Sequence, residues 1–124
     1  MMDEALFSAL SERVTADIYA DFPELLERYG ERGRQKCIDD NMHPFRHLET
    51  ADALRCVKVF TDYAVWPDGI LRKHGMTTAL LIDNFERIAR MADSAFEPDK
   101  AARYRSYLAS GSDILRSGAD SQLP

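Results

Sequence analysis

The sequence predicts an all-α protein, a single bundle of about five to six helices. Apolar residues recur every three or four positions along nearly the whole chain, the spacing that places them on one face of a helix. No segment shows the strict alternation of apolar and polar residues that is typical of a half-buried strand. Glycine, proline, aspartate and threonine interrupt the periodicity at intervals, as residues that begin or end helices do.

Two helices are predicted at the beginning of the chain. Residues 3–20 carry apolar residues at helical spacing and form an amphipathic helix. The segment 21–24, Asp-Phe-Pro-Glu, has the form of a capping box, because the aspartate can accept hydrogen bonds from first-turn amides and proline is tolerated there. A short helix follows, and Gly30 and Gly33 are expected to separate it from the next segment.

The middle of the chain is predicted to form a helix that contains a proline. From Arg34 onward the three-to-four spacing continues straight through Pro44, on Ile38, Met42, Phe45 and Leu48. This continuity favours one helix kinked at Pro44, because proline removes one backbone donor and crowds the preceding turn. The alternative is two helices, the second of which begins at Pro44.

The remaining helices are separated by proline, glycine and threonine. An apolar helix runs over residues 57–67 and ends at its proline, and a short helix over 70–74 ends at a glycine. Thr77 or Thr78 can cap the next helix, and the last begins near Pro98. Residues 1–116 are therefore expected to form one helical bundle domain, and residues 117–124 a frayed tail.

Composition narrows the classes of function. The 124 residues suit one domain, and the net charge of −5 comes without the basic stripe of a nucleic-acid-binding protein. No apolar run reaches the roughly 18–20 residues that span a bilayer. The N-terminus resembles no secretory leader, and the two cysteines, Cys37 and Cys56, are expected to be reduced. These observations favour a cytoplasmic protein that binds neither nucleic acid nor membrane.

One candidate metal site lies on the central helix. Asp40, His43 and His47 fall within a sector of roughly 60° on an unbroken helix, and two histidines four residues apart can reach one metal ion. The same sector lies roughly opposite the apolar stripe, so the competing interpretation is a solvated helix face. A metal ion on these three residues is the one cofactor that the sequence suggests.

Cys37 and a group of three aromatic residues are two further candidate sites. Cys37 could act as a nucleophile or a redox-sensing thiol if Arg34, three residues before it, stabilised the thiolate. Buried structural cysteines are the more frequent case. The aromatic residues Phe60, Tyr63 and Trp66 follow at three-residue intervals, which is typical of core packing, of a pocket wall or of a dimer contact.

The chain resembles small bacterial all-helical domains of unassigned role, some of which adjoin sensory or cobalamin-binding modules. The resemblance covers residues 25–90. It lies in four short motifs, which are Tyr29-Gly-Glu-Arg-Gly-Arg, Cys37-x-x-Asp40, His47-Leu48 and Phe60-x-x-Tyr63-x-x-Trp66. It implies a helical regulatory or sensor-type module and identifies no catalytic residue.

The function that the sequence favours is a regulatory or protein-interaction module that forms a homodimer and catalyses no reaction. A metal- or ligand-sensing protein centred on Asp40, His43 and His47 is the first alternative. A thiol-dependent enzyme that uses Cys37 is the second.

Overall fold

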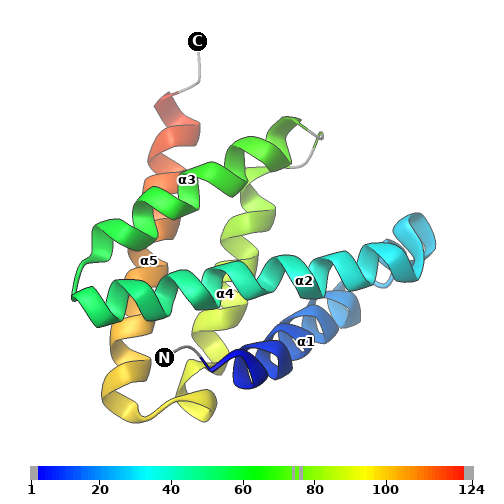
Figure 1. Ribbon diagram of the computed structural model, residues 1–124. Coiled ribbons are helices and arrows are strands. Elements are labelled where there is room, and N and C mark those ends of the chain that lie inside the picture. The colour runs from blue at the N-terminus through cyan, green and yellow to red at the C-terminus, as the bar shows by residue number, and fades with distance from the viewer. Residues whose placement is uncertain (1–2, 74, 76, 122–124) are drawn as a thin grey trace. The chain divides into compact units, whose positions relative to one another are not determined.

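The computed structural model describes residues 3–73, 75 and 77–121, with side chains as far as residue 118. The described residues form five α-helices and contain no strand, so the predicted fold class and number of helices are confirmed (Figure 1). The helices are α1 (Glu4–Asp21), α2 (Glu24–Leu54), α3 (Val57–Lys73), α4 (Thr78–Ala95) and α5 (Pro98–Ser121).

The chain divides into two compact units, Met1–Glu49 and Thr50–Pro124, and α2 contributes to both. A single domain over residues 1–116 stays a prediction. The frayed tail also stays a prediction: α5 is helical as far as Ser121, and residues 122–124 lie outside the described residues.

The first unit contains a pair of antiparallel helices. Contacts join successively later residues of α1 to successively earlier residues of α2. They are the stacked rings of Phe7 and Phe45 at 5.7 Å, the hydroxyl of Ser11 with the Met42 sulfur at 3.4 Å, and the hydroxyl of Thr15 with the Cys37 sulfur at 3.5 Å. Ser11 and Thr15 are buried, and their hydroxyl groups donate to sulfur.

The break in α2 lies at Gly30 and separates a short first segment from a long helix. Gly30 has φ 69° and ψ −171°, which a residue without a Cβ adopts at little cost. The expected separation at Gly30 is thus confirmed, whereas Gly33 lies inside the helix. The helix continues across Pro44 as predicted, and a kink there stays a prediction.

The second unit is built around α5, which packs against both α3 and α4. The rings of Phe60 and Phe85 meet at 5.2 Å in its core, and both side chains are fully buried. Gly111 of α5 lies directly against Phe60, because a Cβ added to this glycine would come within 2.8 Å of the ring. The close approach of α3 to α5 therefore depends on the absence of a side chain at Gly111.

The prediction that a helix ends at Pro67 is wrong. α3 runs without interruption through Pro67 to Lys73. Residues 70–73 of the short helix that was expected are its last part, and residue 74 lies outside the described residues. Phe60, Ala64 and Asp68 are buried at intervals of four residues on both sides of the proline. Packing of this face offsets the single hydrogen bond that Pro67 cannot donate.

Candidate functional site

The loop between α2 and α3 has a well-defined geometry. The amide of Cys56 donates to the Ala51 carbonyl at 2.9 Å, and the amide of Arg55 donates to the Asp52 carbonyl at 3.1 Å. This is the hydrogen-bond pattern of a Schellman motif, which ends a helix with one residue in the left-handed conformation. That residue is Arg55, with φ 49°. The motif ends α2 abruptly and fixes the direction in which α3 leaves.

A carboxylate in the same motif connects it to α5. Asp52, whose side chain is 12 % exposed, accepts hydrogen bonds from Arg103 Nε at 2.6 Å, from Arg103 Nη2 at 3.1 Å and from the Tyr107 hydroxyl at 3.1 Å. Arg55 Nη1 adds a fourth donor at 3.1 Å. The hydrogen bonds from Arg103 and Tyr107 hold the pKa of Asp52 below its ordinary value, although burial acts in the opposite direction. The four donors therefore join the end of α2 and the loop after it to α5.

The inner face of α3 is the face that packs into the core of the second unit. It consists of Phe60, Ala64 and Asp68, all buried. Asp68 Oδ2 lies 3.3 Å from Arg72 Nε, whereas its buried Oδ1 accepts no hydrogen bond from the residues that the structure describes. With one face packed against its neighbours, α3 is held in the second unit.

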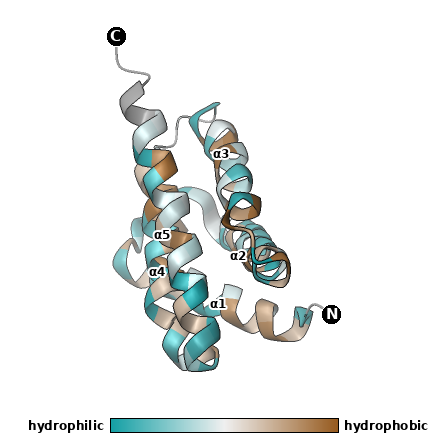
Figure 2. Cartoon of the chain, turned by 90° about the vertical axis from the view of Figure 1, so that its left-hand side faces the viewer, coloured by the Kyte–Doolittle hydropathy of each residue, from teal (hydrophilic) through white to brown (hydrophobic). Residues whose placement is uncertain are grey.

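The opposite face of α3 carries large apolar residues that are not buried. Trp66 is 66 % exposed, the neighbouring Val65 53 % and Ile70 40 %. At 100° per residue, Val59, Tyr63, Trp66 and Ile70 lie within a sector of roughly 60°. We call these four residues the outer stripe. Figure 2 shows brown, apolar positions on α3 beside polar ones.

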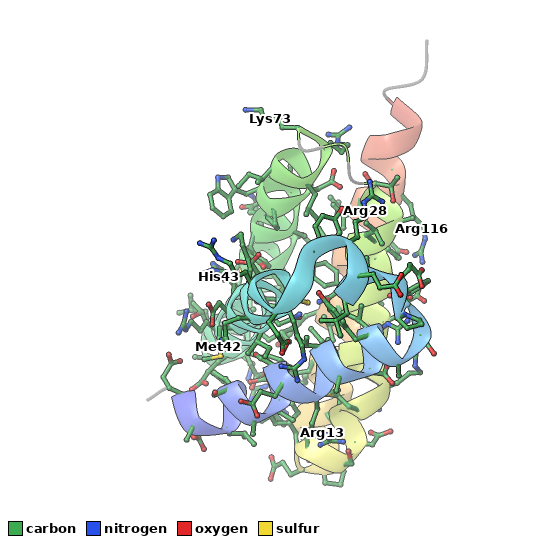
Figure 3. All side chains as sticks on the ribbon, turned by 90° about the vertical axis from the view of Figure 1, so that its right-hand side faces the viewer. Arg13, Arg28, Met42, His43, Lys73 and Arg116 are labelled. Atoms are coloured by element: carbon green, nitrogen blue, oxygen red, sulfur yellow. The ribbon has the colours of Figure 1, made fainter. Side chains whose placement is uncertain are left out.

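Charged residues lie beside the outer stripe at both ends. Lys58 and Asp62 form an exposed ion pair at 2.7 Å near the beginning of α3. At its end Lys73 is exposed, and Figure 3 shows that this side chain projects away from the helices. An apolar surface with a polar rim is the arrangement that protein-binding sites share.

The predicted metal ligands lie on the surface of α2 and are engaged in other interactions. Asp40 pairs with Lys36 at 3.1 Å, and His47 Nδ1 lies 2.8 Å from the carbonyl oxygen of His43. His43 is exposed and points outward in Figure 3. Among the described residues, no three His, Cys, Asp or Glu side chains are arranged so that they could hold a metal ion. The metal site therefore stays a prediction that this geometry does not support.

Cys37 is half-buried on α2, where its sulfur lies 3.5 Å from the hydroxyl of Thr15 on α1. Burial raises the pKa of its thiol above the ordinary value, and the nearby Asp40 carboxylate acts in the same direction. Hydrogen bonds from Thr15 and Asn41, together with the charge of Arg34, oppose this increase. Because the thiolate is the reactive form, a raised pKa disfavours nucleophilic chemistry at neutral pH.

The three aromatic residues that the sequence suggested as an interface or pocket are found in different environments. Phe60 is fully buried in the core, Tyr63 is half-buried beside it at a ring distance of 5.6 Å, and Trp66 is mostly exposed. Ile70 joins Trp66 on the outer stripe. The sequence did not indicate this pair, because the helix was expected to end at Pro67. The four-residue interval between the two was the signal that could have identified this pair.

The second unit also has a shallow hollow between α4 and α5. Its lining includes Phe85, Ala89 and Leu108, and an ion pair between Glu86 and Arg116 at 3.1 Å lies at its edge. The volume of about 190 Å³ is smaller than the roughly 300–1,000 Å³ of small-molecule sites. We therefore do not assign a substrate pocket to this hollow.

The described helices include none with the length and apolar character needed to cross a membrane. No protein-family model, curated protein or solved structure matches the chain. The resemblance to bacterial helical domains stays a prediction. The outer stripe is the feature of this chain on which a functional assignment can be built.

Proposed function

We propose that the chain is a cytoplasmic regulatory or protein-interaction module, without a reaction of its own, that binds protein through the outer stripe of α3. The homodimer that the sequence suggests is the form we propose for this interaction. The observation that carries the proposal is the exposure of Trp66, which leaves two-thirds of the largest apolar side chain in water.

An exposed tryptophan on a helix is unfavourable for a protein that acts alone. Aromatic side chains bury roughly 150–250 Å² when they pack, and tryptophan is enriched among the residues that contribute most to protein–protein binding. Ile70 and Val65 enlarge the apolar surface next to Trp66, so this is not an isolated apolar residue.

The contacts that hold α3 in the second unit also support a binding role. The four donors to Asp52 hold the end of α2, just before α3, against α5, and the close approach of Gly111 to Phe60 places the first half of α3 against α5. A surface on a rigid helix loses little conformational freedom on binding, which improves affinity for a given buried area.

The test is to immobilise the full chain and to measure which proteins, including a labelled second copy of the chain, it retains. Trp66→Glu places a charge in the centre of the outer stripe and should reduce specific retention at least about tenfold, as the loss of a central aromatic residue does. Leu26→Glu is the matched control, because Leu26 is 46 % exposed and lies on α2 in the first unit. Its retention should equal that of the unaltered chain.

Circular dichroism and the melting temperature should be the same for both variants, since both residues are exposed. If Trp66→Glu is folded and retains the same proteins, the outer stripe is not the binding surface and the proposal fails.

A further inference from the structure

We infer that the outer stripe pairs with the outer stripe of a second copy of this chain, with the two α3 helices antiparallel and in one register. This inference rests on the proposed function and identifies the molecule that occupies the surface. In the proposed register Tyr63 lies opposite Trp66 of the second copy, and Val59 lies opposite Ile70 of the second copy.

The spacing of the stripe is that of a helix-pairing seam. Its members are separated by four, three and four residues, which is the spacing of the two apolar positions in each heptad of a coiled coil. The centre of the stripe lies roughly 130° around the helix from the buried face of Phe60, Ala64 and Asp68, at 100° per residue. α3 therefore has two distinct apolar faces, one for its own core and one that faces outward.

The order of side chains along the stripe is nearly the same in both directions. Valine, tyrosine, tryptophan and isoleucine form a β-branched, aromatic, aromatic, β-branched series. A two-fold symmetric interface requires residue i to meet residue j while j meets i. One antiparallel register satisfies this condition for all four residues and pairs aromatic with aromatic and β-branched with β-branched. This self-complementarity is what favours a second copy over an unrelated partner.

Net charge does not oppose self-association. The second unit has ten acidic and ten basic residues, so two such units can meet without repulsion between net charges.

The available area predicts a weak dimer. The exposed parts of Trp66, Ile70 and the two half-buried members of the stripe amount to roughly 300 Å² per copy, given 150–250 Å² for one aromatic side chain. A standard interface buries about 800 Å² per partner. We therefore expect a dissociation constant in the roughly micromolar range, with dimers at tens of micromolar that separate on dilution.

Cross-linking between single-cysteine variants tests the register. The background carries Cys37→Ala and Cys56→Ser, so it has no cysteine. Two single-cysteine variants, Val59→Cys and Ile70→Cys, are made in this background and purified separately. Each is treated with a short bis-maleimide, alone and as an equal mixture. The antiparallel register predicts that the mixture forms covalent dimers at least about tenfold faster than either variant alone, because only the mixed pair places the two thiols in one layer.

Adding Trp66→Glu to both variants should abolish the cross-link, whereas adding Leu26→Glu should leave it unchanged. Circular dichroism must show that the cysteine-replaced background retains its helices and its dimerisation by light scattering. If Val59→Cys cross-links to itself as fast as the mixture does, the antiparallel register is wrong. A monomer by light scattering at 100 times the expected dissociation constant, with no cross-link in any mixture, overturns self-pairing altogether.

The same variants separate this failure from failure of the proposed function. If the chain is monomeric but retains other proteins in a manner that depends on Trp66, self-pairing is overturned and the interaction role stands. If neither second copies nor other proteins depend on Trp66, both proposals fail.

Discussion

The two units of the chain differ in charge and in the way their helices are joined. Eleven acidic and six basic residues fall in Met1–Glu49, so this unit carries a net charge of −5, whereas Thr50–Pro124 is neutral. The first unit joins α1 to α2 through hydroxyl and sulfur contacts and one stacked ring pair. The second relies on buried aromatic rings and on the donors around Asp52. The neutral unit is the one that carries the outer stripe, and its net charge does not oppose a contact between two identical chains.

The largest effect is expected from the core of the second unit. Phe60→Ala removes a fully buried ring that touches Phe85 and should lower the free energy of unfolding by about 3–5 kcal/mol. Trp66→Ala, although it removes a larger side chain, should cost less than about 1 kcal/mol because Trp66 is mostly in water. Urea denaturation of both variants, well below the dissociation constant expected for the dimer, measures the difference. Equal losses would mean that the outer face of α3 is packed within a single chain.

The Asp52 interactions should give the next largest effect. Asp52→Ala leaves Arg103 and Tyr107 without their acceptor and should lower the free energy of unfolding by about 2 kcal/mol. In the first unit, Asp39 is exposed and accepts one hydrogen bond from Gln35, so Asp39→Ala should have little effect. A loss at Asp39 as large as at Asp52 would remove this distinction between the units.

The same carboxylate should contribute to acid sensitivity. The pKa of Asp52 is lower in the folded chain than in the unfolded chain, so its stabilising contribution is fully present above the unfolded pKa of about 4. The contribution is lost as the pH falls from there through the folded pKa. Asp52→Asn should therefore flatten the pH dependence of stability below about pH 4, as measured by urea midpoints. An unchanged slope would contradict this assignment.

Two glycines of α5 should give smaller changes in stability, of opposite sign, when each is replaced by alanine. Gly111→Ala places a Cβ within 2.8 Å of the buried Phe60 ring, and the cost of overpacking should exceed the gain in helix propensity by about 1 kcal/mol. Nothing lies within 4 Å of a Cβ at Gly118, so Gly118→Ala should stabilise by up to about 1 kcal/mol. Melting temperatures should shift in opposite directions. A shift in the same direction would mean that α3 and α5 are less closely packed than described.

The smallest effect is expected at the ion pair between Glu4 and Arg46 in the first unit. Their closest atoms are 2.6 Å apart, but both side chains are substantially exposed. Glu4→Gln should lower the melting temperature slightly at low ionic strength and not at all in about 1 M salt, where the Debye length is roughly 3 Å. A loss that persists in high salt would show that this contact is not mainly electrostatic.

Local signals predicted most of the helix boundaries. The expected helix over residues 3–20 is α1, Thr77 precedes the first residue of α4, and α5 begins at Pro98. Gly75, with φ 79°, follows α3 where a glycine stop was expected. Such features depend on the chemistry of a few neighbouring residues, so they can be read directly from the sequence.

Features that depend on distant residues could not be predicted. Asp52 lies 51 residues from Arg103, and no local pattern indicates that the two meet. Pro67 looked like a helix end because its effect was judged without the packing of Phe60 and Asp68 on either side. Asp40, His43 and His47 share a helix face as the spacing indicates, but a shared face does not determine which other residues each one binds.

The distance in sequence between Asp52 and Arg103 also has a consequence for the order of folding. Closing a loop of about 50 residues costs entropy that is recovered only when its contacts form. During synthesis at about 5–20 residues per second, α5 becomes available roughly 3–10 seconds after the motif that ends α2. The helices of Met1–Glu49 can pair within that interval, because all their partners have already been made. The packing that holds α3 can thus be completed only after α5 has been made.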